Sequence, residues 1–398
     1  MDDIYQASTE LHRKFKGKLN ISGKMPLKSR TDLAHLYTPG VAGPCKEIAA
    51  NLESIWDLTS RRDWVAVITD GSSVLGLGDI GPAAGMPVME GKCLIFKEFG
   101  GLNAFPIGLK TQDINEFVEA VKLISLSFGA VNLEDISAPR CFEIERRLKA
   151  ELDIPVMHDD QHATAIVTIA GLINALKLTG RSFETARFVI SGFGAAGTAV
   201  MNMLLVLGAT DIIIADRKGI VHQERPELDH WRRSIAAYTN LGNERGTLED
   251  AVVERDVFVG VSGAGILTEK MIRTMAPDPI IFALANPIPE VMPDIAYAAG
   301  AAVVATGRSD FPNQVNNALV FPGLFRGVLE ARAPHITEHM KLAAAQALAD
   351  LIQEPSRENV IPDIFDEGVA RAVSHAVLTV AMKSKMMSTQ PSLTSVLQ

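Results

Sequence analysis

The 398-residue sequence has few of the residues that a disulfide-stabilised or nucleic-acid-binding protein needs. Its three cysteines, Cys45, Cys93 and Cys141, lie far apart and form no Cys-x-x-Cys pair, which excludes a disulfide framework and a thiolate zinc site. Lysine and arginine total 38 against 47 aspartate and glutamate residues, a net charge of −9. This acidic balance lacks the positive field that a nucleic acid attracts, so we expect no nucleic-acid partner.

Long uninterrupted apolar stretches are also absent from the sequence. The most apolar one, residues 163–178, contains Thr164, Thr168, Asn174 and Lys177, so it predicts a buried helix and not a membrane span. The first twenty residues contain no apolar run typical of a secretory signal. We therefore expect no membrane association and a cytoplasmic location, in which the thiols stay reduced.

Short β-branched runs, each followed by a glycine-rich turn and a longer helical pattern, dominate from about residue 187 to residue 305. Most of these runs are apolar throughout, as in parallel strands that helices cover on both faces. The predicted strands are residues 64–69, 187–191, 211–215, 257–261, 280–284 and 302–305. This alternation predicts an α/β protein with a Rossmann-like, doubly wound domain.

The regions on either side of this alternation differ from it. Residues 114–128 and 139–152 have long helical patterns, and residues 341–352 and 368–382 form alanine-rich helical segments. We predict two domains. Residues 161–317 form the doubly wound domain, and residues 1–160, completed by the C-terminal helices within 318–398, form a second α/β domain.

A glycine-rich sequence follows the predicted strand at 187–191 and precedes a helical pattern at 198–207. Its residues are Gly192, Gly194, Ala195, Ala196 and Gly197. With an acidic residue at the end of the next strand, this context is the fingerprint of an NAD(P) site, in which the glycines allow a tight turn and close approach to the pyrophosphate. That acidic residue, Asp216, suits the ribose hydroxyls of NAD, whereas the adjacent Arg217 and Lys218 suit the additional phosphate of NADP. The sequence leaves the choice between NAD and NADP open.

A second glycine-rich turn, residues 259–265, follows another strand of the same domain. In one interpretation, Ser262 and its neighbours line the nicotinamide side of the cofactor. In the other, the segment is an ordinary turn at the end of a strand.

Two acidic pairs follow short strand-like runs. They are Glu134-Asp135 and Asp159-Asp160. Acids at strand ends can converge on one Mg²⁺ or Mn²⁺, because these cations prefer carboxylate oxygens. The alternatives are solvent exposure or a helix N-terminus, but two such pairs beside a dinucleotide domain favour a metal. His158 and His162 have a spacing that suits zinc, yet no third nitrogen or sulfur ligand is evident nearby, which disfavours a zinc site.

A series of sequence blocks resembles the malic enzyme family in its shorter bacterial form, over about residues 20–385. The blocks are YTPGVA from Tyr37, TDGSSVLGLGDIG from Thr69, EGK ending at Lys92, LED ending at Asp135, HDDQH from His158, ANP from Ala285 and NNALVFPG from Asn316. The resemblance implies oxidative decarboxylation of L-malate to pyruvate and CO₂, with reduction of NAD or NADP and a requirement for Mg²⁺ or Mn²⁺. It also implies that residues 1–160 hold the substrate and the metal, and that the protein is a homodimer.

The resemblance assigns roles to particular residues. Lys92 is implied as the general base for the C2 hydroxyl and Tyr37 as the general acid for C3 of enolpyruvate, with Asp159 adjusting the pKa of Lys92. A lysine acts as a base near neutral pH only if its pKa is lowered, and we expect burial beside the metal and the nicotinamide to lower it. The implied metal ligands are Glu134, Asp135 and Asp160. The implied substrate contacts are Tyr37, Lys92, Asn286 and Asn317. We expect Ser262 and Asn286 to contact the cofactor together with the glycine-rich loop.

The sequence departs from the family pattern at two positions. Val74 stands where large animal-type members have an arginine that binds the malate carboxylate, so another residue must bind that carboxylate, and the sequence does not identify it. Ala163 follows His162, where small members often have glycine.

Other functions remain to be separated from the leading one. A malolactic enzyme of the same family would release lactate and retain the cofactor, so accumulation of reduced cofactor distinguishes the two. An amino-acid dehydrogenase would not need the paired acids. A non-catalytic NAD(P)-binding regulatory protein would not need the implied catalytic and metal residues, which are all present.

Overall fold

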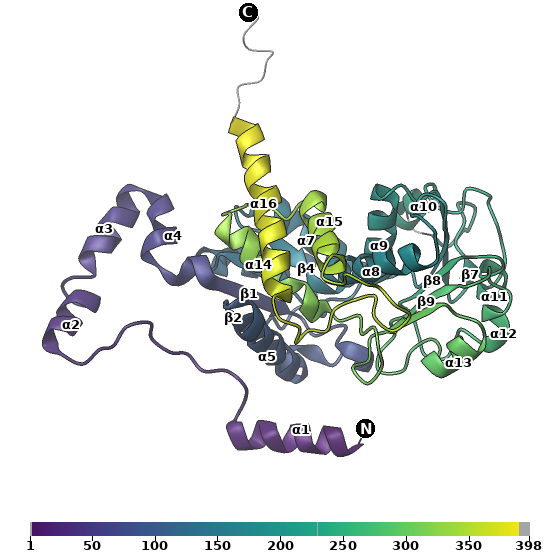
Figure 1. Cartoon of the computed structure of the whole chain (residues 1–398). Coiled ribbons are helices and arrows are strands. Elements are labelled where there is room, and N and C mark those ends of the chain that lie inside the picture. Colours follow the sequence, from purple (N-terminus) through teal and green to yellow (C-terminus); the bar gives the residue numbers. More distant parts are fainter. Residues whose placement is uncertain (1, 229, 390–398) are drawn as a thin grey trace, which may run out of the picture.

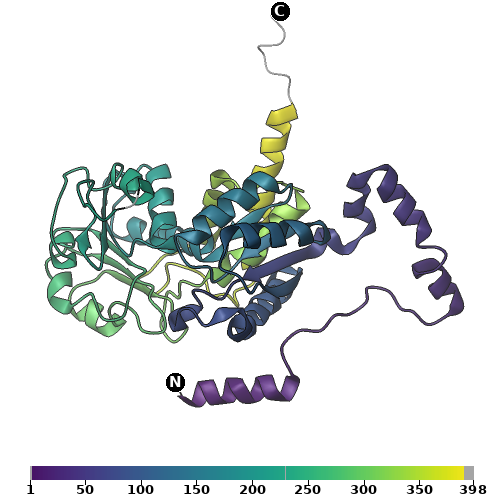
Figure 2. The same cartoon turned by 180° about the vertical axis from the view of Figure 1, so that it is seen from behind.

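The computed structural model describes residues 2–228 and 230–389 and contains two sheets flanked by helices (Figures 1 and 2). One sheet has the strand order β2-β1-β3-β4 with parallel neighbours, and the other has the order β10-β9-β8-β5-β6-β7, parallel except for the β6–β7 pair. The strands are β1 (Trp64–Thr69), β2 (Asn103–Gly108), β3 (Ala130–Leu133), β4 (Val156–His158), β5 (Arg187–Ser191), β6 (Asp211–Asp216), β7 (Gly219–Ile220), β8 (Val257–Gly260), β9 (Ile280–Ala283) and β10 (Val303–Thr306). The predicted α/β class with a Rossmann-like sheet is confirmed, and each predicted strand lies within one residue of its expected ends.

Helices connect and cover these strands. The α-helices are α1 (Asp2–Phe15), α2 (Arg30–Leu36), α3 (Ala42–Ala50), α4 (Ile55–Leu58), α5 (Gly81–Gly100), α6 (Ile114–Ile124), α7 (Arg140–Glu151), α8 (Asp159–Leu178), α9 (Ala195–Val206), α10 (His230–Ala236), α11 (Leu248–Ala251), α12 (Glu269–Ile272), α13 (Pro293–Ala298), α14 (Phe321–Glu330), α15 (Glu338–Ala349) and α16 (Val369–Thr389). Short 3₁₀ helices are η1 (Leu52–Ser54), η2 (Ser60–Asp63), η3 (Leu75–Leu77), η4 (Ser125–Ser127) and η5 (Asn317–Leu319).

The central strand of the first sheet, β1, is apolar on both faces. Because successive side chains of a strand point in opposite directions, Val65 and Val67 pack into a core with α5, α8 and α14, whereas Ala66 and Ile68 pack against α6 and α7. The first of these cores is continuous with the face of the second sheet that α8 and α9 cover. One apolar core therefore joins the two sheets.

The C-terminal helices pack back on the first sheet, as the sequence analysis predicted. The ring of Phe96 in α5 lies 4.7 Å from that of Phe321 and 5.3 Å from that of Phe325, both in α14. Helix α15 packs on α8, and α16 packs on α14 and α15. Helix α8 spans the predicted domain boundary at residue 160, and the boundaries themselves stay predictions.

The segment that contains α2, α3 and α4 projects away from this body in both views (Figures 1 and 2). We call residues 20–58 the arm. Its three α-helices contain no buried residue, whereas β1 is buried along nearly all its length. Within the described part of the chain, no helix combines the length and apolar character that crossing a membrane requires.

Candidate active site

The two acidic pairs meet at one edge of the first sheet. Strand β3 ends immediately before Glu134, and the neighbouring strand β4 ends immediately before Asp159. The register pairs Leu133 with His158, so the residues that follow these two lie side by side at the carboxyl ends of parallel strands. This is the edge at which open α/β sheets bind ligands.

Three of these carboxylates form a group that suits a divalent cation. Oxygen atoms of Glu134, Asp135 and Asp160 all lie within 4.8 Å of one another. The backbone N–H of Asp135 donates to Asp160 Oδ2 at 3.0 Å, and Asp135 itself has a left-handed backbone with φ of 53°, which aspartate tolerates better than most residues. An all-oxygen, largely buried donor set is the one that Mg²⁺ and Mn²⁺ prefer.

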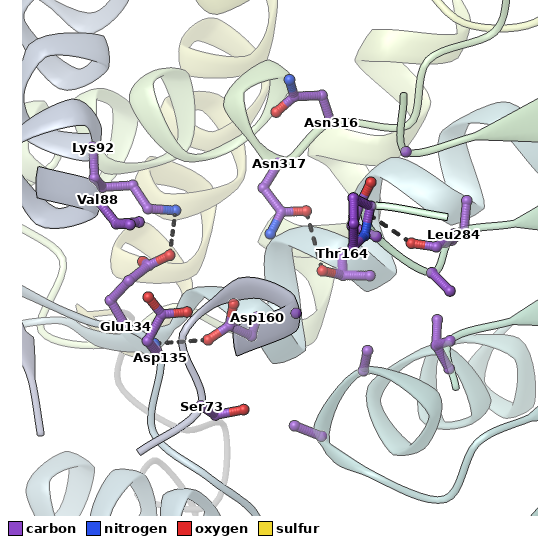
Figure 3. Close-up of a pocket in the computed structure, with 18 of the residues that line it drawn as sticks. Ser73, Val88, Lys92, Glu134, Asp135, Asp160, Thr164, Leu284, Asn316 and Asn317 are labelled. Carbon is purple, nitrogen blue, oxygen red and sulfur yellow. Dashed lines mark hydrogen bonds and ion pairs between the residues drawn. The ribbon is translucent and has the colours of Figure 1, made fainter. Parts of the chain in front are cut away.

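Lys92 reaches into this group from α5 (Figure 3). Its Nζ lies 2.9 Å from Glu134 Oε1 and donates to Asp159 Oδ2 at 2.5 Å. The ammonium also lies 4.1 Å from the centroid of the Phe321 ring, a cation–π contact. Both carboxylates and the lysine are nearly excluded from solvent, so the position of the ammonium is closely defined.

The protein groups around Lys92 do not by themselves lower its pKa, so the expected lowering by a metal and the nicotinamide stays a prediction. Burial lowers the pKa of Lys92, but the charges of Asp159 and Glu134 outweigh burial and hold that pKa above its ordinary value. Burial also raises the pKa of Glu134 and of Asp159, and neighbouring carboxylates add to both shifts. The physical cause is common to all three groups: several buried carboxylates surround a single ammonium, so the cluster holds protons strongly.

Asn317 lies opposite this cluster, at the start of η5. Its Nδ2 donates to Asp159 Oδ2 at 3.0 Å, and its Oδ1 accepts from Thr164 Oγ1 at 3.1 Å, the second bond being drawn in Figure 3. Thr164 follows Asp160 by one turn of α8, a spacing from which the sequence analysis drew no role. Phe321 was likewise given no role, although it belongs to the NNALVFPG block.

One cavity of about 1060 Å³ lies between this cluster and the second sheet. The site residues predicted from the sequence that line it are Lys92, Glu134, Asp135, Asp160, Gly194, Ala195, Ala196, Ser262, Asn286 and Asn317. Asp159 lies behind Lys92 and contacts it directly. The carboxylate cluster and the glycine-rich loop therefore face the same space.

The glycine-rich loop has the close approaches that its residues allow. A Cβ on Gly197 would lie 2.0 Å from the carbonyl oxygen of Gly192, so only glycine lets α9 pack this closely against the turn. Gly192 itself has φ of 124°, a conformation that L side chains rarely adopt. A Cβ on Gly194 would meet no atom within 4 Å, which leaves this backbone open to the cavity at the N-terminus of α9, where an anion is favoured.

The second glycine-rich turn lines the same cavity, and a buried carboxylate that the sequence analysis missed holds it there. Glu290 accepts from the backbone N–H of Ser262 at 2.9 Å and of Ala285 at 3.0 Å. It therefore joins the turn after β8 to the turn after β9, which carries Asn286. Ser262 also bonds Ser191, at the end of β5, through a 3.0 Å contact between the hydroxyl oxygens.

Asp216 lies at the end of β6, where the fingerprint predicts it, but its carboxylate already accepts hydrogen bonds from other residues of the chain. Arg225 donates to both of its oxygens, at 2.9 Å and 3.1 Å, and the Lys218 backbone N–H donates to Asp216 Oδ1 at 2.8 Å. Arg225 is largely buried and also pairs with Glu227. Arg217 is exposed beside this group. Neither Asp216 nor Arg217 is among the described residues that line the cavity.

Tyr37, the general acid that the family resemblance implies, does not lie near Lys92. It caps the C-terminus of α2 on the arm, its side chain is 66% exposed, and it is not among the described residues that line the cavity. A capping box between Ser29 and Asp32 begins this helix, so the short helix has its own local stabilisation. Lys92, the carboxylates and the glycine-rich loop come together within one chain, whereas Tyr37, like Asp216 and Arg217, is not among the described residues that line their cavity.

His162 has partners other than a metal. Its Nε2 lies 3.0 Å from Glu145 Oε2, and its Nδ1 lies 2.9 Å from the Lys341 ammonium in α15. Glu145 also accepts from the backbone N–H of His158 at 2.9 Å. These contacts fix the start of α8, which carries Asp159 and Asp160. Both ring nitrogens of His162 therefore have protein partners in this structure.

Comparison with known proteins identifies the family. A family model described as malic enzyme, N-terminal domain matches residues 16–149, and one described as malic enzyme, NAD binding domain matches residues 162–383. A bifunctional malic/malolactic enzyme of Bacillus subtilis is 52% identical over 96% of this chain and 94% of its own length. An NAD-dependent malic enzyme of Geobacillus stearothermophilus is 50% identical over 92% of this chain and 77% of its own length. The crystal structure of malic enzyme from Pyrococcus horikoshii matches with a TM-score of 0.93 and 44% identity over 96% of this chain and 91% of that one. The chain belongs to the malic enzyme family.

Proposed function

We propose that this protein oxidises L-malate and decarboxylates it to pyruvate and CO₂, with reduction of NAD⁺ or NADP⁺. The observation that carries the proposal is the single cavity lined by Lys92, by the carboxylates of Glu134, Asp135 and Asp160, and by the glycine-rich loop. A hydride acceptor, a proton acceptor and a site for a divalent cation would face one small substrate there. The names of the relatives given above point to the same reaction.

Lys92 acts as the general base in this proposal. As the neutral amine it takes the proton of the C2 hydroxyl while the C2 hydride leaves to the nicotinamide, and Asp159, which Asn317 positions, holds the ammonium that results. The contacts at 2.5 Å and 2.9 Å fix the lysine within reach of a substrate bound at the carboxylates. The oxidised substrate then loses its C4 carboxylate as CO₂, and the electron pair of the broken C3–C4 bond forms the enolate of pyruvate.

Glu134, Asp135 and Asp160 would hold Mg²⁺ or Mn²⁺. When bound, the cation would polarise the C2 oxygen, stabilise the enolate and offset part of the negative charge that raises the pKa of Lys92, while the nicotinamide would supply the hydride acceptor. The buried all-oxygen donor set supports this assignment. Gly194, Ala195 and Ala196 would bind the pyrophosphate through backbone N–H groups, and Ser262 and Asn286 would face the nicotinamide and the substrate.

Tyr37 remains our candidate for the group that protonates C3, and we propose that a second copy of the chain supplies it. The arm that carries Tyr37 exposes an unusual number of apolar side chains, which short helices need to bury. They are Ile21, Met25, Leu27, Leu33, Leu36, Val41, Leu52 and Leu58. A homodimer in which each arm packs on the partner would cover these side chains and bring Tyr37 to the partner's cavity. The cytoplasmic location stays a prediction, with which three free thiols are compatible.

A malolactic activity is the second candidate, because the Bacillus subtilis relative carries both activities in its name. The same site would then keep the reduced cofactor and return its hydride to pyruvate, so that lactate is released. Tight retention of the cofactor by the two loops that Glu290 joins would favour this outcome.

The first experiment follows absorbance of the reduced nicotinamide with L-malate and Mn²⁺, with NAD⁺ and NADP⁺ in parallel, with and without a chelator. Reduction that the chelator abolishes, together with pyruvate, supports malic enzyme activity and identifies the cofactor. Lactate without net reduction supports the malolactic candidate. Dinucleotide binding without either product would contradict both and favour a regulatory protein.

A further inference from the structure

Helix α1 and the turn after it form one wall of the active-site cavity. Ser8 and His12, one helical turn apart on α1, and Lys18, just beyond its end, all line the cavity together with Val88 and Lys92 of α5. This wall lies outside the motifs that carry the proposed chemistry. It is nevertheless polar where it meets the cavity.

Lys18 is held against α5 by two hydrogen bonds. Its backbone N–H donates to Glu90 Oε2 at 3.0 Å, and its ammonium donates to the carbonyl oxygen of Pro87 at 2.7 Å. The position that a Cβ on Gly91 would occupy lies 3.6 Å from the ammonium. The charge of Lys18 therefore lies over the residue that precedes the general base, Lys92, at the edge of the cavity.

Of the two described lysines that line the cavity, Lys18 is the one whose charge no nearby carboxylate neutralises by direct contact. Lys18 and Lys92 are the lysines among the described lining residues, and no arginine is among them. The ammonium of Lys92 is neutralised by Glu134 and Asp159. Within residues 2–228 and 230–389 the Lys18 ammonium donates to a carbonyl oxygen and has no carboxylate within 4.0 Å, although the charge of Glu90 acts on it from farther away. Its charge can therefore act on a ligand.

We propose that the Lys18 ammonium binds the C4 carboxylate of L-malate, an inference that rests on the malic enzyme activity proposed above. A cation held by the three carboxylates would supply a positive partner at the C1 end of malate, and the C4 carboxylate would still need one. Val74 is apolar and fully buried, so it offers this carboxylate no charge.

A partly exposed lysine at the edge of the cavity also fits the chemistry of decarboxylation. The C4 carboxylate must lose its negative charge as it leaves as CO₂, so a buried, close ion pair would stabilise the reactant more than the transition state. Lys18 is only half-buried, and water screens its charge. It would therefore select a dicarboxylic acid at the binding step without greatly opposing the loss of CO₂.

The test compares Lys18→Gln with Lys16→Gln in the full-length enzyme with Mn²⁺ and the preferred cofactor. Lys16 lies in the same turn, is exposed and does not line the cavity, so Lys16→Gln is the matched control. We expect Lys18→Gln to raise the KM for malate about 10- to 100-fold, with kcat and the KM for the cofactor nearly unchanged. The inhibition constant of pyruvate, which lacks the C4 carboxylate, should stay at the wild-type value, and Lys18→Arg should recover most of the affinity for malate.

Two further measurements separate binding from structure. Glu90→Ala removes the acceptor for the Lys18 backbone N–H but keeps the ammonium, so it should change the KM for malate far less than Lys18→Gln does. A parallel rise in the malate KM and the pyruvate inhibition constant, or an equal effect of Glu90→Ala, would show a merely structural role and overturn the inference. An unchanged KM in Lys18→Gln would overturn it while leaving the proposed function intact. A wild-type enzyme that binds malate by calorimetry without turnover would instead contradict the proposed function.

Discussion

The first sheet and the arm both carry proposed catalytic groups, but the sheet is buried and the arm is exposed. Residues 65–68 of β1 are fully buried, and the carboxylates at the edge of that sheet contact Lys92 within one chain. On the arm, Leu33, Leu36 and Tyr37 are 46%, 37% and 66% exposed. A buried sheet fixes its side chains by its own packing, whereas a short helix with an exposed apolar face is fixed only when another surface covers it. The proposed base and metal ligands thus lie together within one chain, whereas the proposed acid lies on a segment that its own packing does not fix.

The largest effect is expected on the sheet side of this comparison. Lys92→Met removes the general base, so kcat should fall about 10³-fold, near the middle of the range for such groups. Titration of the variant with NAD⁺ or NADP⁺ should still show binding, because the glycine-rich loop is untouched. A variant that retains a tenth of the wild-type kcat would show that another group takes the hydroxyl proton.

On the arm side, Tyr37→Phe should lower kcat about 10²-fold through loss of the proton donor. If the acid comes from the partner, mixing Tyr37→Phe with Lys92→Met after dissociation and reassembly should restore about a quarter of the wild-type activity, since half of the dimers are hybrids with one intact site. Each variant reassembled alone is the control. No recovery in the mixture would place Tyr37 and Lys92 of one chain at the same site.

A weaker perturbation removes the proposed contact surface of the arm without touching either catalytic group. Leu33→Asp combined with Leu36→Asp should shift sedimentation toward the 42.9 kDa monomer and lower activity about tenfold at low protein concentration. The matched control is Leu123→Asp, which changes a leucine of α6 that is 82% exposed on the body. A dimer that survives the double substitution would show that the arm is not the contact.

The smallest effect is expected in the second sheet, where packing again fixes the functional group. Arg225→Met removes two hydrogen bonds that orient Asp216, so the KM for NAD⁺ should rise about three- to tenfold while kcat changes little. Steady-state kinetics with NAD⁺ and NADP⁺ would measure the shift, with Lys270→Met, an exposed lysine of α12, as the control. If kcat falls by the same factor by which the KM for NAD⁺ rises, Arg225 has a role beyond positioning Asp216 for the ribose.

The sequence predicted those parts of the molecule that depend on neighbours along the chain. Strand positions followed from apolar runs, and the glycine fingerprint followed from residues 192–197 and Asp216. The acidic pairs were also visible, because each ends a strand and parallel strands end at a common edge. All of these signals lie within a few residues of the feature they predict.

Contacts between segments that lie far apart along the chain could not be predicted from the sequence. Nothing near Glu290 indicates that its carboxylate joins two turns, and nothing near Lys18 indicates that it lies on α5. The effect of the surrounding carboxylates on the pKa of Lys92 was missed for the same reason, since it depends on how many carboxylates the fold brings to one ammonium. The position of Tyr37 away from Lys92 was missed because a motif gives the identity of a residue and not the place to which the fold brings it.

Helix α8 contacts both halves of the proposed site. It begins with Asp159 and Asp160 at the carboxylate cluster, and its 20 residues make a rod about 30 Å long. Along this rod it packs against α9, which opens at the glycine-rich loop, and near its far end Asn174 is bonded to the carbonyl oxygens of Ala349 and Val360. One continuous helix thus carries the carboxylates at its start and packs on the helix that follows the glycine-rich loop. Substitutions in the middle of α8, far from either ligand, should consequently alter how strongly the binding of one ligand depends on the other.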